Sequence, residues 1–169
     1  MVEVRLTAVR VDLQSNTPVI LLQEPDGAHR TLPIFIGAAE ATAIALAQQG
    51  VATPRPMTHD LLRDVIESLD ARVDHVVVTE LRAATFYAEI HLRSGSGETV
   101  VSSRPSDAVA LAVRVSCPLY VSDELMDSEA VVLQLDDEDD AEQANPDSLV
   151  GEFREFLDKV KPEDFGSTT

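Results

Sequence analysis

The sequence predicts an α+β fold in which two units of three strands and a helix form one domain. Apolar residues recur at every second position in short segments, which is typical of strands. Two Ala-rich helical segments each follow a third strand, and they align at an offset of 67 residues, with Glu40 facing Asp107. Glycine-containing turns at Gly27 and Gly95–Gly97 align at nearly the same offset. Two such units are expected to pack a sheet against helices.

The first unit is predicted from its alternation and its turns. Period-two apolar residues over 2–13 predict a strand that bends near Ala8, and the shorter strands 19–22 and 31–36 follow. After Gly37, a run of small residues predicts a helix over Ala38–Gln48. Gly50 marks its end, because glycine is typical just after a helix.

An amphipathic helix is expected between the two units. Pro54 and Pro56 indicate a rigid connection before it. Thr58 is suited to cap its start, and Asp60 lies near the positive end of the helix dipole. Its apolar positions follow the helical repeat: Leu61, Leu62, Val65, Ile66 and Leu69.

The second unit repeats the order of the first. Its predicted strands are 73–81, 85–93 and 99–102, followed by a second small-residue helix over Ala108–Val115. A short strand over 119–121, one helical turn over 122–126 and a last strand over 131–135 complete the expected domain.

Composition excludes several classes of protein. The chain has 169 residues and is 44% hydrophobic, which excludes wholesale disorder, and it has no apolar run long enough to cross a membrane. The net charge of −17 excludes a generic basic coat for nucleic acid, because phosphate binding depends on Lys and Arg. The single cysteine, Cys117, allows no intramolecular disulfide and is expected to be buried and inert. The single cysteine and the lack of an export signal together predict a cytoplasmic protein.

The negative charge is concentrated at the C-terminal end. Residues 1–122 carry 14 acids and 10 bases, whereas residues 123–169 carry 16 acids and 3 bases. The run of acids after Leu135 predicts an acidic flexible linker over 136–146. Residues 147–169 are expected to form a C-terminal amphipathic helix and tail. The apolar positions of that helix are Leu149, Val150, Phe153, Phe156, Leu157 and Val160.

Different roles are open for the helix and for the acidic residues of this tail. The helix could dock on its own domain, on a sister subunit or in the groove of a protein partner. The acidic residues could also mimic nucleic acid and occlude a basic cleft, or they could serve only to keep the protein in solution.

Three motifs in order resemble the bifunctional nuclease (BFN-domain) family. They are Pro33-Ile34-Phe35-Ile36-Gly37 with Glu40-Ala41, Arg55-Pro56-Met57-Thr58-His59-Asp60-Leu61-Leu62, and Arg104-Pro105-Ser106-Asp107-Ala108-Val109-Ala110-Leu111-Ala112. The similarity runs from about residue 2 to residue 135, so residues 1–135 are expected to form a BFN-like globular domain. The resemblance implies a cytosolic homo-oligomer that cleaves both RNA and DNA with little sequence preference.

The resemblance also supplies the candidate site, since no HExxH motif, glycine-rich phosphate loop or zinc-ligand spacing occurs. The candidate catalytic residues are Asp107, His59, Asp60 and Glu40. Asp107 and Asp60 are also the candidate ligands of Mg²⁺ or Mn²⁺, and Arg104 and Arg55 are the candidate phosphate-binding residues. No organic cofactor is expected.

Each candidate also has a purely structural interpretation. Acids in the first turn of a helix interact with its dipole, as Asp107, Asp60 and Glu40 would do. His59 could be a surface hydrogen-bonding residue, and the arginines could form structural ion pairs. His75 and His91 lie on predicted strands and are interpreted as surface or edge residues.

Two other functions remain open. The domain could be a non-enzymatic homo-oligomeric interaction module whose C-terminal helix binds a protein partner. A small-molecule pocket between the two units is a further alternative. If Glu40, His59, Asp60 and Asp107 lie far apart and face different sides, a composite catalytic site fails. If they line one cleft, within a subunit or across a subunit interface, the enzyme is favoured.

Overall fold

An eight-stranded sheet organises residues 1–132, the part of the chain that the computed structural model describes. The strand order is β6-β5-β4-β7-β1-β2-β3-β8, and all neighbours are antiparallel except β4 and β7. The strands are β1 (Val2–Asp12), β2 (Thr17–Gln23), β3 (Arg30–Phe35), β4 (Ala71–Arg82), β5 (Thr85–Ser94), β6 (Gly97–Ser103), β7 (Leu119–Val121) and β8 (Val131–Val132). The helices are α1 (Ala38–Gln48), α2 (Thr58–Ser68), α3 (Pro105–Val115) and α4 (Asp123–Glu129).

This mixture of a sheet and helices confirms the predicted α+β class. The short strand β7 lies near the centre, with β1, β2, β3 and β8 on one side and β4, β5 and β6 on the other. The internal duplication itself stays a prediction. The bend predicted near Ala8 is present as a register shift in the β1–β2 pairing between Leu6 and Ala8.

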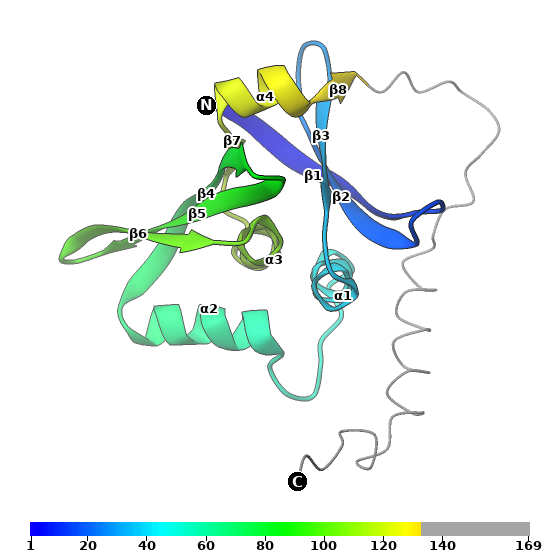
Figure 1. Ribbon diagram of the computed structural model, residues 1–169. Coiled ribbons are helices and arrows are strands. Elements are labelled where there is room, and N and C mark those ends of the chain that lie inside the picture. The colour runs from blue at the N-terminus through cyan, green and yellow to red at the C-terminus, as the bar shows by residue number, and fades with distance from the viewer. Residues whose placement is uncertain (133–169) are drawn as a thin grey trace, which may run out of the picture.

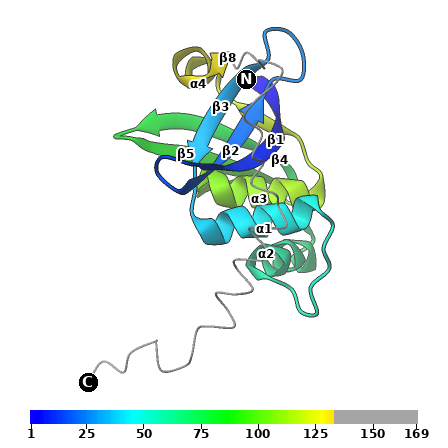
Figure 2. The ribbon, with the colours of Figure 1, turned by 90° about the vertical axis from the view of Figure 1, so that its right-hand side faces the viewer.

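The core forms where α1 and α3 pack against one face of the sheet (Figures 1 and 2). Strand partners such as Ile20 with Ile34 and Val76 with Ile90 place their side chains on this face, because alternate residues of a strand point the same way. Both helices bury runs of small residues, Ala41–Leu46 in α1 and Ala108–Ala112 in α3. These small side chains allow close contact between the two helices.

The helix starts differ in detail from the sequence prediction. Helix α1 has the predicted bounds, whereas α3 begins at Pro105, three residues earlier than expected, because proline suits the first turn of a helix. Met57, and not Thr58, is the N-cap of α2. Asp60 completes this cap, since its Oδ2 accepts a hydrogen bond of 3.0 Å from the backbone N–H of Met57.

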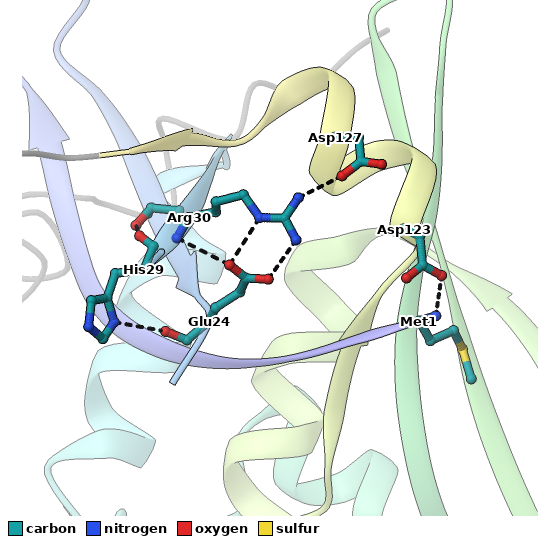
Figure 3. Close-up of polar contacts among 7 residues, drawn as sticks. Met1, Glu24, His29, Arg30, Asp123 and Asp127 are labelled. Carbon is teal, nitrogen blue, oxygen red and sulfur yellow. Dashed lines mark hydrogen bonds and ion pairs between the residues drawn. The ribbon is translucent and has the colours of Figure 1, made fainter. Parts of the chain in front are cut away.

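Helix α4 is held at the far end of the sheet by ion pairs (Figure 3). The Arg30 guanidinium binds both carboxylate oxygens of Glu24, at 2.7 and 3.0 Å, and reaches Asp127 of α4 at 2.6 Å. The bond from Arg30 holds the pKa of Glu24 below its usual range, although burial opposes this. The amino group of Met1 pairs with Asp123 at the start of the same helix. These contacts connect α4 to β3 and to the start of β1.

Helix α2 turns much of its apolar face to solvent. It buries His59 and Ile66 against the domain, whereas four large apolar side chains remain exposed: Leu61, Leu62, Val65 and Leu69. The sequence pattern alone suggests a helix that buries this whole face.

Within the described residues the predicted last strand is present as β8, and its remaining residues, 133–135, fall outside them. The predicted linker 136–146 and the predicted helix and tail 147–169 also lie outside them. Among the helices of residues 1–132, none has the length and apolar character needed to cross a membrane.

Candidate functional site

Four of the predicted site residues meet where α1, α2 and α3 begin. We call Glu40, His59, Arg104 and Asp107 the Asp107 cluster. Glu40 lies in the first turn of α1, His59 in the first turn of α2 and Asp107 in the first turn of α3, while Arg104 is the N-cap of α3. Three helix starts that are distant in the sequence therefore contribute to one polar group.

Asp107 is the centre of the cluster. Its Oδ2 accepts a hydrogen bond of 2.7 Å from Arg104 Nε, and its Oδ1 lies 3.1 Å from both Arg104 Nη2 and His59 Nε2. Partial burial alone would raise the pKa of Asp107, but the bonds from Arg104 and His59 hold that pKa below its usual value. The carboxylate is therefore charged at neutral pH.

Arg104 joins Asp107 to Glu40. Its Nη2 lies 2.8 Å from Glu40 Oε1, so one guanidinium bridges two carboxylates. These bonds raise the pKa of Arg104, and its side chain remains 66% exposed. Gly37 gives the Glu40 carboxylate its place, because a Cβ at position 37 would collide with Glu40 Oε2.

His59 is the buried member of the cluster. The residue is 8% exposed, and since a carboxylate only accepts hydrogen bonds, its Nε2 carries the proton shared with Asp107. Its Nδ1 is buried and has no hydrogen-bond partner among the described residues. The polar contact of the imidazole is therefore the one with Asp107, and its unprotonated Nδ1 faces the protein interior.

Asp60 belongs to a different ion pair. Its Oδ1 lies 2.6 Å from Arg114 Nε near the end of α3, and Arg114 also donates to the carbonyls of Ala110 and Ala43 at 2.9 and 3.0 Å. Arg114 follows Asp107 by seven residues, about 10 Å along the helix. The adjacent residues His59 and Asp60 therefore bind opposite ends of α3, and the structure does not bring Asp60 into the Asp107 cluster.

Arg114 is an ion-pair residue that sequence reasoning missed. Its side chain is only 5% exposed, and it connects α2, α3 and α1. One signal in the sequence could have identified Arg114: it is a charged residue in a predicted helix whose other residues are small or apolar. A charge in such a helix indicates a buried ion pair. The equivalent position in the first helix is Ala47.

Arg55 lies apart from these groups in the loop before α2. Arg55 is exposed, and its backbone carbonyl accepts a hydrogen bond of 2.7 Å from Thr53 Oγ1. No ion pair of its guanidinium is present within residues 1–132. Its phosphate-binding role stays a prediction.

The carboxylates of Asp60 and Asp107 do not, in this arrangement, fit a divalent cation. Both oxygens of each are bonded to arginine, histidine or a backbone N–H, so an ion would have to displace these partners. The described part of the chain contains no group of three or more His, Cys, Asp or Glu side chains arranged to hold a metal. Metal assistance stays a prediction, to be tested with metal ions and a chelator.

Two other histidines form a separate group on the opposite face of the sheet. The rings of His75 and His91 stack at 4.1 Å between centroids, and each Nδ1 lies within 3.0 Å of a carboxylate, Asp74 or Glu98. Both side chains are half-buried. Their strand neighbours Val76 and Ile90 face the helices, so the stacked pair is not part of the Asp107 cluster.

Cys117 is expected to react slowly with alkylating reagents. Burial raises the pKa of its thiol to about 11, so at pH 8 the thiolate is scarce. Alkylation by iodoacetamide at pH 8 should be about 100-fold slower than for an exposed cysteine peptide. Mass spectrometry of timed samples measures the rate. A rate equal to that of the peptide would contradict the assignment of Cys117 as an inert thiol.

The fold and the cluster define an α+β domain with a polar group at three converging helix starts, and the family follows from comparison with known proteins. The model of the bifunctional nuclease domain matches residues 20–134. This range is more than half of the chain, and the protein therefore belongs to the bifunctional nuclease domain family.

The chain is similar to relatives of two kinds, and those named bifunctional nucleases support this membership. An uncharacterized protein of Mycobacterium tuberculosis strain H37Rv is 44% identical over 168 residues, which cover 99% of this chain and all of that protein. Bifunctional nuclease 1 of Oryza sativa subsp. indica is 27% identical over 115 residues, 65% of this chain and 35% of that protein. Bifunctional nuclease 2 of Arabidopsis thaliana is 30% identical over 106 residues, 61% of this chain and 32% of that protein.

Proposed function

We propose that this protein is a low-specificity nuclease that hydrolyses phosphodiester bonds of RNA and DNA at the Asp107 cluster. The observation that carries the proposal is the convergence of Glu40, His59, Arg104 and Asp107 from three helix starts. Family membership supports the same activity, since the plant relatives are named bifunctional nucleases.

The cluster offers the groups that phosphodiester hydrolysis needs. Arg104 is exposed, and its Nη1 takes no part in the ion pairs within residues 1–132, so this atom can donate to a phosphate oxygen. Its positive charge stabilises the additional negative charge of the transition state. Glu40 and Asp107 hold the guanidinium in place from two sides.

Asp107 is the group that would orient and deprotonate the attacking water, through Oδ2, which accepts one hydrogen bond, from Arg104 Nε, and has a second lone pair. The new bond forms between the water oxygen and phosphorus, the proton passes to the carboxylate, and the ester P–O bond breaks. The leaving oxygen takes its proton from solvent. His59 positions Asp107 through the bond at Nε2 and does not itself reach the phosphate, because its free nitrogen faces the interior.

The remaining predictions belong to this proposal. Arg55 is kept as a candidate phosphate-binding residue, whereas Asp60 pairs with Arg114 outside the Asp107 cluster. A requirement for Mg²⁺ or Mn²⁺ is left to the test below. We also propose that the domain is a duplication and a homo-oligomer. The placement of Glu40 and Asp107 in the first turns of α1 and α3, each after three strands, supports the duplication.

The test compares the wild-type protein with Arg104→Met on labelled single-stranded RNA and double-stranded DNA. We expect the wild type to cleave both and Arg104→Met to lose about 10-fold or more in rate, because a phosphate-binding donor is removed. Arg82→Met is the matched control, since Arg82 is 63% exposed and lies at the end of β4, outside the cluster. Parallel reactions with Mg²⁺, Mn²⁺ and EDTA determine whether a metal is needed.

The outcomes separate the proposal from its rival. Absence of cleavage by the wild type under all conditions, or equal loss in both variants, would contradict a nuclease site at the Asp107 cluster. The alternative is a non-enzymatic interaction module, which the exposed apolar face of α2 favours. It would then be the better description of the domain.

A further inference from the structure

The apolar face of α2 is a feature of the domain that the proposed nuclease does not use. Leu61, Val65 and Leu69 are spaced four residues apart and therefore lie on one side of the helix, with Leu62 beside them. Leu61 is 56% exposed and Leu69 is 71% exposed. The side of α2 that contacts α3 carries His59 and Ile66 instead, so this apolar side faces away from the domain core.

We propose that residues 149–160 of the same chain dock on this face of α2. Their sequence has the complementary pattern, with the apolar positions Leu149, Val150, Phe153, Phe156, Leu157 and Val160 on one predicted helical face. That face would span about 16 Å, and Leu61 to Leu69 span about 12 Å, so the two surfaces are similar in length.

The basic side chains of the tail are concentrated at the docking segment. The last 47 residues contain three basic side chains, Arg154, Lys159 and Lys161, and all lie in or directly after the proposed docking segment. The exposed acids Glu67 and Asp70 lie on and after the last turn of α2, beside Leu69. Residues 149–160 carry three acids and two bases, whereas residues 133–148 carry seven acids and no base, so the docking segment is repelled far less by these acids than the linker before it.

The chain is long enough for this contact. Strand β8 ends at Val132, at the opposite end of the domain from α2 (Figures 1 and 2). The residues between, 133–148, can extend to about 50 Å, whereas a compact domain of this size has a diameter of about 36 Å. A tethered segment has an effective concentration of about 1 mM, which favours its own domain over a second copy at ordinary protein concentrations.

Trypsin cleavage of the full-length protein tests the docking. Cleavage after Arg154 and Lys159 should be slow in the wild type. It should become about 10-fold faster when Leu61, Val65 and Leu69 are all changed to Ser, because docked segments resist proteolysis. Leu13→Ser is the matched control, since Leu13 is 84% exposed and lies in the turn after β1. Circular dichroism verifies that each variant is folded.

If the triple variant does not fold, a second measurement tests the same contact from the side of the tail. In a Cys117→Ser background, Val65→Cys places a thiol on the α2 face. Adding Phe153→Ser, Phe156→Ser and Leu157→Ser should raise its reaction rate with a maleimide about 10-fold, while a thiol from Leu13→Cys should not respond.

Three results would overturn the proposal. Wild-type cleavage as fast as that of a free peptide of residues 143–165 would show that nothing protects the segment. Protection that is lost on dilution would assign the contact to a second copy. A thiol at position 65 that does not respond to the tail substitutions would show that the tail does not cover α2.

Discussion

Asp107→Asn is expected to lower the rate of RNA and DNA cleavage by at least about 100-fold, the scale of a lost general base. The amide keeps the size of the side chain but removes its charge and its ability to accept a proton from water. It also removes the charge-assisted bonds that hold Arg104 and His59 at 2.7 and 3.1 Å. Both the base and the orientation of the phosphate-binding arginine are therefore lost together.

The measurement is the initial cleavage rate at saturating RNA, with thermal unfolding recorded by circular dichroism. Glu67→Gln is the matched control, because Glu67 is an exposed acid on α2 that lies outside the cluster. It should cleave as fast as the wild type. Equal rates for Asp107→Asn and the wild type would indicate a contaminating nuclease or a site elsewhere on the domain.

Arg114→Met is expected to cost about 3–5 kcal/mol in the free energy of unfolding, because it leaves the charge of Asp60 without its partner at a partly buried position. The substitution also removes the hydrogen bonds to the carbonyls of Ala43 and Ala110, which connect α3 to α1. Urea unfolding at pH 7 measures the change. Arg63→Met is the control and should change stability by less than about 1 kcal/mol, since its pair with Asp64 is solvent-exposed.

The loss of stability caused by Arg114→Met should become smaller as the pH falls. Burial would raise the pKa of Asp60, but in the wild type Arg114 and the N–H of Met57 hold it below its usual value. That interaction stabilises the folded state above the unfolded pKa of about 4 and is lost as pH falls through the folded pKa. The difference between the wild type and Arg114→Met should therefore shrink from pH 7 towards pH 3. A constant difference across this range would contradict a role through the charge of Asp60.

The secondary structure followed from short-range patterns in the sequence. Helix α1 has the bounds that the small-residue segment and Gly50 predict, and the strands match the period-two pattern within a few residues. These features are local, because a helix repeat, a turn glycine or a proline acts within a few residues. Met57 differs as the cap of α2 because its carbonyl already accepts a helical hydrogen bond from Leu61 N–H and its own N–H donates to the Asp60 carboxylate.

The candidate residues of the site also came from the sequence, but their grouping did not. His59 and Asp60 are neighbours with the same predicted roles, yet one binds Asp107 and the other binds Arg114. Neighbouring helix residues point about 100° apart, so the packing of α2 across α3 decides which partner each one reaches. The same packing angle leaves Leu61, Val65 and Leu69 exposed although their pattern is that of a buried face.

The sequence by itself determined the α+β class, the main elements, the family and the residues Glu40, His59, Arg104 and Asp107 as candidates. Only the tertiary structure decided that these four residues form one cluster and that Asp60 lies outside it. It also decided that the buried Arg114 is the partner of Asp60. The physical reason is the range of the interactions. The His59–Asp107 and Asp60–Arg114 bonds join residues 48 and 54 positions apart, and such contacts are set by how helices pack and not by any local pattern.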